Sequence, residues 1–553
     1  MDPLSPTLPA PADSARSTSP SQPAPPPTTT TSGGADSTKA RSARRSPAAR
    51  LAAIPWPLFA ILAIQAALSA RLLHLNGDFV DEGTYIYAGH QVLDHWIHGW
   101  ADPAYATYFS GAPTIYPPIA GAVDYFGGLI AVRILSMIFM LWATTMLWAT
   151  AQRLFGRIAA FAGCAIFISI GSTQALGAFA TYDAMAFSLL VTGVYCAVRA
   201  AEAHEEAPWW PLCATLLALA NATKYTTALW DPLVLALLLI LVHARSGLGP
   251  AIRLVAGVAA MTASLLALGL ALGGSFYVDG ITSTTLTRAA GTLSRLVIAR
   301  EVWHWVGWAL VFGALGLLVA ALLRRSRTQF ALIGVFVLAS LAAPLNQMRI
   351  STDTSLEKHV DFGVWFACVA AGYVVTSIAR ALPGLLRKAP VRVLTATVLT
   401  AAGLSLTLSP GLAQADAYFH TWPDGQPVAD AMKRYVTPGQ SQYLVEDYDV
   451  EAYYLMDDAK WQQWDNTWYF TYYSHELHKT ISGTAAYIDA LKDHYFDLIV
   501  LDFGDTSVVD HAITDAMQAC PDHCGYRVVT VVPYQGATWK GQFTIWQYQG
   551  AQS

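Results

Sequence analysis

Two adjacent carboxylates open the segment Asp81-Glu82-Gly83-Thr84-Tyr85, directly after the first long apolar stretch of the chain. A carboxylate within hydrogen-bond reach can take the proton from a hydroxyl or an amine as it attacks an electrophilic carbon. Alternatively, the pair belongs to an ordinary solvated loop. Ionisable residues near membrane depth are functional candidates by default, so the position beside an apolar stretch favours chemistry.

Further charged residues stand at the ends of later apolar stretches. Asp183 begins one of them, and Lys224 lies between two others. The basic candidates are Lys224, Arg288, Lys358 and His359. Such side chains bind phosphate groups well. Ordinary alternatives remain: Asp183 as a helix N-terminal acid, Lys224 as a lysine that snorkels to the interface, and residues 349–359 as a polar loop.

The composition predicts the surroundings of these residues. Of the 553 residues, 54% are hydrophobic and only 13% are charged, whereas soluble proteins carry about a quarter charged residues. Apolar windows of roughly 20 residues, the length that crosses a bilayer, recur about eleven times. They cover 54–74, 128–150, 158–174, 180–200, 209–221, 225–243, 252–274, 302–323, 329–346, 361–381 and 391–411. The sequence therefore predicts an α-helical polytopic membrane protein.

Charge distribution predicts its orientation in the cell membrane. Residues 1–50 are rich in Pro, Ser, Thr and Ala and end in a basic run. We expect this tail to be disordered, because it cannot bury enough apolar surface, and to lie in the cytoplasm. Every inner loop is then basic except the one around Glu202, in agreement with the positive-inside rule. The odd span count places the C-terminus, and all the candidate residues above, outside the cytoplasm.

The chain after the last span, residues 412–553, is expected to form a soluble extracytoplasmic domain. Its β-like runs are Tyr443–Glu446, Phe496–Phe503, Tyr526–Tyr534 and Phe543–Gln549, with helix-like stretches at Val428–Tyr435 and Ala485–His494. Such alternation predicts a small α/β domain. Cys520 and Cys524 could close a disulfide in an oxidising compartment.

The ordered pattern resembles the GT-C glycosyltransferases, and within them the lipid A aminoarabinose transferase and protein O-mannosyltransferase group. The family shows Asp-Glu-x-x-Tyr in its first outer loop, where this chain has Asp81 to Tyr85. The weaker matches are Tyr116-Pro117-Pro118, Arg133, Thr181-Tyr182-Asp183 and Thr223-Lys224-Tyr225. The resemblance covers about 51–410, so 51–411 would be the catalytic domain.

The resemblance implies roles for these residues. Asp81 would be the catalytic carboxylate, and Glu82 would support it or help to hold a divalent cation. Asp183 would be the acid of the second loop. The donor phosphate would meet the four basic side chains, and Tyr85, Tyr116 and Tyr182 would be aromatic motif residues. One departure matters: aminoarabinose transferases have a lysine before the proline of the second-span approach, whereas this chain has Tyr116 and Pro117.

The sequence thus predicts a membrane glycosyltransferase. It would move a sugar from a polyprenyl-phosphate donor to a glycan, lipid or protein acceptor on the outer face. No nucleic-acid partner is expected. Two alternatives stay open, a transporter or lipid flippase and a surface protein that binds sugars through its C-terminal domain. Transporters tend to place ionisable groups near mid-membrane, whereas these lie at the ends of the apolar segments.

Overall fold

The computed structural model describes residues 56–202, 208–381, 389–439, 441–536 and 538–550. The predicted disordered tail, residues 1–50, lies outside this range. Within it, nine of the eleven predicted membrane segments each fall on one helix. The segment 158–174 covers α5 and the short helix α6 (Gly171–Leu176), and 225–243 covers η2 (Tyr225–Trp230) and α9, which together form one span. The main helices of the eleven segments are α2 (Trp56–Ala70), α4 (Tyr116–Phe155), α5 (Arg157–Ser169), α7 (Tyr182–Glu202), α8 (Trp209–Thr223), α9 (Asp231–Ser246), α10 (Leu248–Ile281), α11 (Arg295–Leu322), α12 (Arg327–Ile350), α13 (Leu356–Ala381) and α14 (Ala389–Tyr418).

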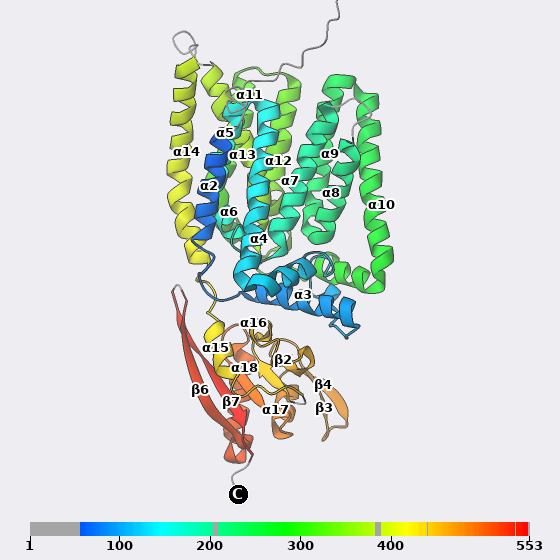
Figure 1. Ribbon diagram of the computed structural model, residues 1–553, viewed down its shortest axis with the longest axis vertical. Coiled ribbons are helices and arrows are strands. Elements are labelled where there is room, and N and C mark those ends of the chain that lie inside the picture. The colour runs from blue at the N-terminus through cyan, green and yellow to red at the C-terminus, as the bar shows by residue number, and fades with distance from the viewer. Residues whose placement is uncertain (1–55, 203–207, 382–388, 440, 537, 551–553) are drawn as a thin grey trace, which may run out of the picture. The chain divides into compact units, whose positions relative to one another are not determined.

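Eight of these helical segments are long and apolar enough to cross a membrane, among the described residues. The other three, α2, α5 and α8, have 15, 13 and 15 residues. Helices suit this setting because each satisfies its own backbone hydrogen bonds without water. In α13 the most apolar window is 89% buried, whereas in α10 it is 11% buried. Helix α13 is therefore the centre of the bundle, and α10 lies at its edge (Figure 1).

Glycines divide two of the long helices. Gly127 and Gly128 have non-helical backbone angles inside α4, and Gly128 has a φ of +63°. Gly274 breaks α10 in the same way, with a φ of +73°. Only glycine adopts such angles without strain. The predicted second span, 128–150, begins at the break in α4.

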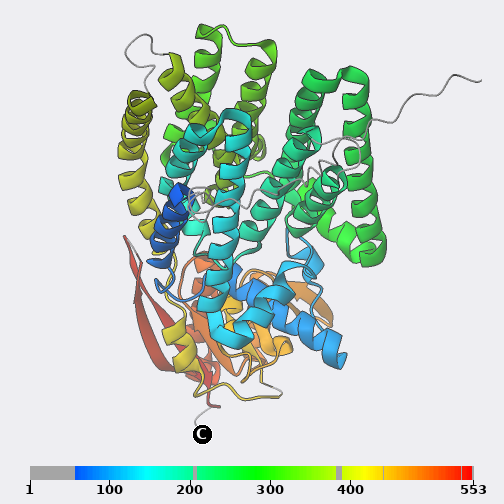
Figure 2. The same ribbon diagram turned by 45° about the horizontal axis from the view of Figure 1, so that its top comes forward.

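Helix α3 (Val80–His98) runs across one end of the bundle, between the bundle and the C-terminal domain (Figures 1 and 2). We call this end the domain end. A Cβ atom added to Gly89 of α3 would lie 2.0 Å from the carbonyl oxygen of Pro117 in α4. The close approach of the two helices therefore requires glycine at this position. Helix η1 (Tyr105–Thr107) follows α3.

The C-terminal domain contains a five-stranded sheet in the order β2-β1-β5-β7-β6. Strands β2 and β5 pair in parallel with β1, and β7 pairs antiparallel with β5 and β6. The strands are β1 (Tyr443–Val445), β2 (Trp464–Asn466), β5 (Leu498–Leu501), β6 (Tyr526–Gln535) and β7 (Lys540–Tyr548). A separate hairpin joins β3 (Thr471–Ser474) to β4 (Lys479–Ser482). The predicted α/β class and all four predicted strands are confirmed.

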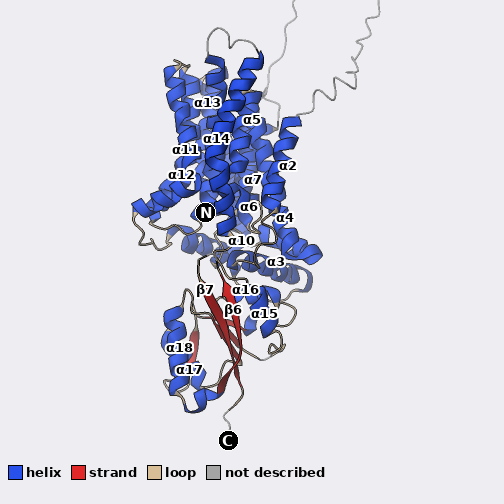
Figure 3. Cartoon of the chain, turned by 90° about the vertical axis from the view of Figure 1, so that its left-hand side faces the viewer, coloured by secondary structure: helices blue, strands red, loops and turns tan. Residues whose placement is uncertain are grey.

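Helices cover both faces of the sheet (Figure 3). Side chains alternate between the faces of a strand, and Leu444 and Ile499 pack toward α17 (Thr484–Lys492) and α18 (Ser507–Ala519). Tyr443 and Val500 face a second core. That core includes α15 (Gln426–Met432) and α16 (Tyr448–Tyr454), and it continues into α3 and the first residues of α4 and α7. One continuous core thus joins the sheet to the domain end.

Candidate functional site at the domain end

The predicted loop acids lie in the first turn of helix α3, where a helix favours negative charge. Glu82 is completely buried and forms a bidentate ion pair with buried Arg133 of α4. The guanidinium donates from Nε to Oε1 over 2.8 Å and from Nη2 to Oε2 over 2.7 Å. The planar guanidinium and the carboxylate match in a bidentate arrangement, so both hydrogen bonds are direct and no bridging water is required.

Glu82 and Arg133 also form hydrogen bonds with backbone groups around them. Glu82 also accepts hydrogen bonds from the N–H groups of Phe79 and Ala180, over 3.1 and 2.8 Å. Arg133 donates to the carbonyls of Leu73 and Gly77. Both carboxylate oxygens are thereby occupied, and Glu82 holds three segments of the domain end together.

Asp81 has a different environment. Its side chain remains 31% exposed, whereas the Lys358 ammonium that donates to Asp81 Oδ2 belongs to a side chain only 6% exposed. Lys358 comes from the first turn of α13, far away in the sequence, and also lies 5.4 Å from the ring centre of Phe179. Asp81 is thus a carboxylate that a substrate can reach, with a cation beside it.

A second ion pair joins Asp183 of α7 to Lys224 at the end of α8, and both side chains are buried. Thr181 donates a hydrogen bond of 3.0 Å to Asp183 Oδ2. The Lys224 ammonium also lies 4.8 Å from the ring centre of Tyr182. The structure thus pairs the Lys224 ammonium with a buried acid, whereas a lysine that snorkels would leave its charge at the interface.

The remaining basic candidates complete this region. His359 follows Lys358 on α13 and is buried, with its Nδ1 3.1 Å from Gln347 Nε2 of α12. Arg288 is exposed in the segment between α10 and α11, within electrostatic reach of His359. The structure thus brings together basic residues that lie up to 135 positions apart, from Lys224 to His359.

The three motif tyrosines pack against one another beside Asp81. The rings of Tyr85 and Tyr182 lie 4.4 Å apart, and Tyr116 makes edge contacts with both. All three are buried. They form a rigid aromatic floor that links α3, α4 and α7.

Acids of the C-terminal domain approach the same helix from the other side. Burial, with a smaller contribution from the negative charge of Asp81, raises the pKa of Asp449 in α16 to about 7, although a hydrogen bond with Thr84 of α3 opposes the shift. No sequence pattern indicated this neighbour, because a short helix of mixed composition such as α16 carries no clear periodicity.

A second acid cluster lies at the carboxyl edge of the sheet. Glu446 follows β1, Asp502 follows β5, and Asp510 lies in α18, with ligand-type oxygens within 4.8 Å of one another. Burial, followed by a hydrogen bond shared with Glu446, raises the pKa of Asp502 to about 8 and that of Asp510 to about 9. Burial opposes ionisation of Glu446 as well, but hydrogen bonds to it outweigh that effect and lower its pKa to about 2.

This second cluster bears on the candidate divalent cation. At the Asp81-Glu82 pair, Glu82 has no oxygen left for a metal, and Asp81 is engaged by Lys358. That pair therefore does not fit a metal site. The cluster around Glu446 has oxygens at a spacing suitable for a cation. Backbone N–H groups of Thr506 and Gly504 bind the two oxygens of Glu446 itself.

Cys520 and Cys524 form a disulfide between α18 and β6. The bond lies at the far edge of the C-terminal domain's sheet, away from the residues that face α3. Its place therefore gives it a structural role within the domain.

Comparisons with known proteins agree with this arrangement. Residues 125–263 match the family described as dolichyl-phosphate-mannose-protein mannosyltransferase. ArnT from Cupriavidus metallidurans, in a structure bound to undecaprenyl phosphate, is similar at 14% identity over 88% of this chain and 97% of that chain, with a TM-score of 0.55. In the apo state the same protein gives 13% identity, the same coverage and a TM-score of 0.54.

An oligosaccharyltransferase from Archaeoglobus fulgidus is similar at 12% identity over 87% of this chain and 74% of that chain, with a TM-score of 0.52. No curated protein sequence matches the chain significantly. Identities this low reflect a shared fold. The chain therefore has the GT-C fold of membrane glycosyltransferases.

Proposed function

We propose that this protein is a membrane glycosyltransferase that moves a sugar from a polyprenyl-phosphate donor to an acceptor at the outer face. One observation carries the proposal: Asp81 is partly exposed and is surrounded by Lys358, Asp183 and Lys224 at one end of a GT-C-fold bundle. The neighbours bound to undecaprenyl phosphate and dolichol phosphate support a donor of this class.

The chemistry follows from these groups. The acceptor hydroxyl or amine attacks the anomeric carbon, and the bond from that carbon to the phosphate oxygen breaks. The electron pair stays on the polyprenyl phosphate, and the acceptor proton passes to the Asp81 carboxylate. A general base of this kind contributes about 10²- to 10⁴-fold to the rate.

Lys358 connects the base to the leaving group. In the present structure its ammonium is bound to Asp81. The donor phosphodiester carries one negative charge, and its oxygens compete for the protons of the Lys358 ammonium, because phosphate oxygens are strong acceptors. A second negative charge develops on the phosphate as the bond to the sugar breaks. We infer that donor binding draws Lys358 toward the phosphate and frees Asp81 to accept a proton. Lys224 and Arg288 would add positive charge around the departing phosphate, and the His359 ring would offer it a hydrogen-bond donor.

Glu82 is a positioning residue in this scheme. Its two oxygens fix the first turn of α3 to Arg133 and to Ala180. Asp81 stands next to it in the same turn, so its carboxylate is held in place by its neighbour's ion pair. No step of the proposed transfer runs through a metal ion.

The orientation is part of the proposal. The basic loops at the end opposite the C-terminal domain, such as the one with Arg324, Arg325 and Arg327, support a cytoplasmic location for that end. The domain end and the C-terminal domain then face outward. Single cysteines in place of Ser326 and Ser553, treated with an impermeant thiol reagent on intact cells, test this. Labelling of the Ser326→Cys protein without labelling of the Ser553→Cys protein would reverse the orientation.

The test of function compares Asp81→Asn with the wild type. The purified protein is placed in lipid nanodiscs with radiolabelled polyprenyl-phosphate sugars and a cell-envelope acceptor fraction. We expect Asp81→Asn to lower transfer by about 100-fold or more, with the fold retained in a thermal melt. Asp102→Asn is the control, because this acid lies beyond the other end of α3 and its side chain is similarly exposed, at 30%.

Near-normal transfer by Asp81→Asn would remove the assignment of the base. Uptake or flipping of the labelled lipid by the wild type without any sugar transfer would instead favour a transporter. The charged groups lie at the ends of the helices, whereas transporters tend to place them near mid-membrane, and this disfavours the transporter.

A further inference from the structure

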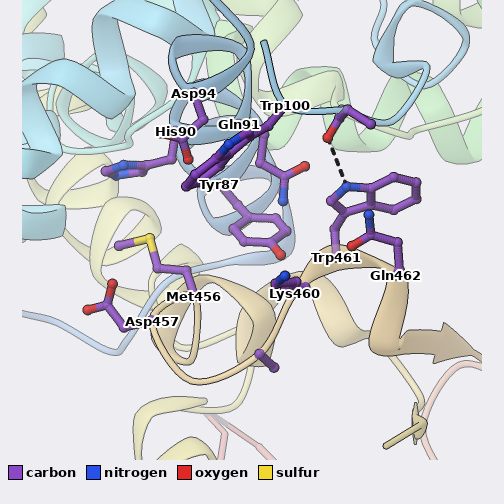
Figure 4. A pocket seen from close by; sticks show the side chains of 12 residues that line it. Tyr87, His90, Gln91, Asp94, Trp100, Met456, Asp457, Lys460, Trp461 and Gln462 are labelled. Carbon is purple, nitrogen blue, oxygen red and sulfur yellow. Dashed lines mark hydrogen bonds between the residues drawn. The ribbon is translucent and has the colours of Figure 1, made fainter. Parts of the chain in front are cut away.

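A second cleft opens on helix α3 beyond Asp81. It lies between α3 and residues 456–462 of the C-terminal domain and has a volume of about 420 Å³. That volume falls within the range of about 300–1,000 Å³ found for small-molecule sites. Tyr87, His90 and Gln91 point into it from α3, and Lys460 and Trp461 come from the facing segment (Figure 4).

The lining combines aromatic faces with hydrogen-bonding groups of both kinds. Tyr87, Trp100 and Trp461 supply rings. The polar groups are His90, Gln91, Asp94, Asp457, Lys460 and Gln462. A saccharide presents apolar C–H faces and hydroxyls that both donate and accept. It therefore needs rings to stack on and mixed donors and acceptors around them. A phosphate would need mainly cations, which this cleft lacks because acids balance Lys460.

The walls of the cleft are fixed before any ligand arrives. Trp461 Nε1 donates a hydrogen bond of 3.1 Å to the carbonyl of Ala101, which ties the two walls together (Figure 4). His90 Nε2 lies 2.8 Å from Asp124 Oδ2, and Tyr453 donates over 2.7 Å to the other oxygen of Asp124. Preorganised side chains lose little entropy when a ligand binds, so the cleft is suited to bind a ligand.

The position of the cleft connects it to the transfer site. Tyr87 stands six residues after Asp81 on the same helix, which is about 9 Å along the axis and about 120° around it, so an acceptor would have to reach around α3 from the cleft to Asp81. We propose that the cleft binds the saccharide part of the acceptor, so that the acceptor class of the proposed transferase is a glycan or glycolipid. That the bound saccharide is an acceptor rests on the proposed function. That the cleft binds a saccharide rests on its lining alone.

The test separates these two parts. Full-length protein in nanodiscs, without donor, is probed by saturation-transfer NMR with defined oligosaccharides of hexoses, pentoses and N-acetylhexosamines. We expect one class to bind, and we expect Trp100→Ala to weaken it by about tenfold, the loss of one aromatic contact of about 1.4 kcal/mol. Gln462→Ala should also weaken it, and the acceptor KM should rise in parallel.

Trp96→Ala is the matched control. Trp96 is 56% exposed and Trp100 is 61% exposed, and both lie at the same end of α3, but only Trp100 lines the cleft. Equal effects of the two variants would mark the tryptophans as membrane anchors and overturn the inference. Absence of saccharide binding, or binding of unglycosylated peptides instead, would overturn it as well. If the wild type transferred no sugar from polyprenyl-phosphate donors while Trp100-dependent saccharide binding persisted, the proposed function would fail and the saccharide site would stand.

Discussion

Acidic side chains gather in two regions of this molecule, the domain end of the bundle and the carboxyl edge of the sheet. At the domain end each of three acids faces a cation: Asp81 with Lys358, Glu82 with Arg133, and Asp183 with Lys224. At the sheet edge, Glu446, Asp502 and Asp510 face one another. In the first arrangement the carboxylates and the cations both stay ionised, which suits a site that binds the donor phosphate of the proposed function. The second is stable only while protons are shared, because neighbouring buried carboxylates cannot all ionise.

The largest effect on stability should come from Glu82→Gln. The change leaves the buried Arg133 guanidinium without its anion, and breaking a buried pair costs about 3–5 kcal/mol. The free energy of unfolding, or the apparent Tm of the full chain in detergent, should fall accordingly. Glu202→Gln is the control, because Glu202 pairs with Arg153 at the surface and exposed pairs contribute about 0–1 kcal/mol.

A Glu82→Gln protein as stable as Glu202→Gln would show that Arg133 finds other partners in the carbonyls of the 73–77 segment. The double variant Glu82→Gln with Arg133→Met should regain part of the stability, because it removes the unpaired charge.

The sheet edge should give a smaller effect that depends on pH. The folded pKa values of Asp502 and Asp510, about 8 and 9, exceed the value near 3.9 of an unfolded aspartate. Their contribution to stability is therefore full below about pH 4 and is lost as the pH rises through 8 and 9. Each extra proton held by the folded state lowers the free energy of unfolding by about 1.4 kcal/mol per pH unit in that window.

Hydrogen exchange of the full chain, corrected for intrinsic rates, measures this effect on β5. Protection of β5 should decrease between pH 6 and 9, and Asp510→Asn should flatten the change. Asp515→Asn, an exposed acid on the same helix, should leave it as in the wild type. A pH profile that Asp510→Asn does not alter would assign the charge effect to another group.

The smallest effect on stability is expected for Lys358→Met. The change leaves Asp81 without its cation, but water reaches Asp81, so the loss should be about 1 kcal/mol, as for an exposed pair. Transfer should nevertheless fall strongly, because Lys358 faces the donor phosphate in the proposed scheme. A thermal melt beside a transfer assay measures both. Loss of stability as large as in Glu82→Gln would make the Asp81–Lys358 pair structural as well.

Much of the fold followed from local pattern. The apolar windows located every helix of the bundle among the described residues, because a bilayer requires long runs of apolar side chains. The β-branched and aromatic runs located β1, β5, β6 and β7 in the same way. Short elements escaped prediction. The 464–466 strand and helix α16 were not foreseen, because a few residues carry too little periodicity. Helix α18 was missed although its 13 residues are amphipathic.

The candidate site was predicted as a list of residues but not as a set of partners. The sequence by itself determined that Asp81, Asp183, Lys224 and Lys358 stand at the ends of apolar segments, since charge is expensive inside a bilayer. Only the tertiary structure decided which cation meets which acid. Helix α13 brings Lys358 to Asp81 across 277 positions. Such pairing depends on how helices pack, which no local pattern encodes.

The tertiary structure also decided the different environments of the two adjacent acids, Asp81 and Glu82. In the sequence Asp81 and Glu82 are simply adjacent carboxylates, and only the family resemblance assigns catalysis to Asp81 and a supporting role to Glu82. The helical turn that contains them points one carboxylate at Arg133 in the core and leaves the other partly exposed to solvent. Successive residues on a helix differ by about 100° in direction. Adjacent acids of the same kind therefore have separate environments, one suited to structure and the other to reaction.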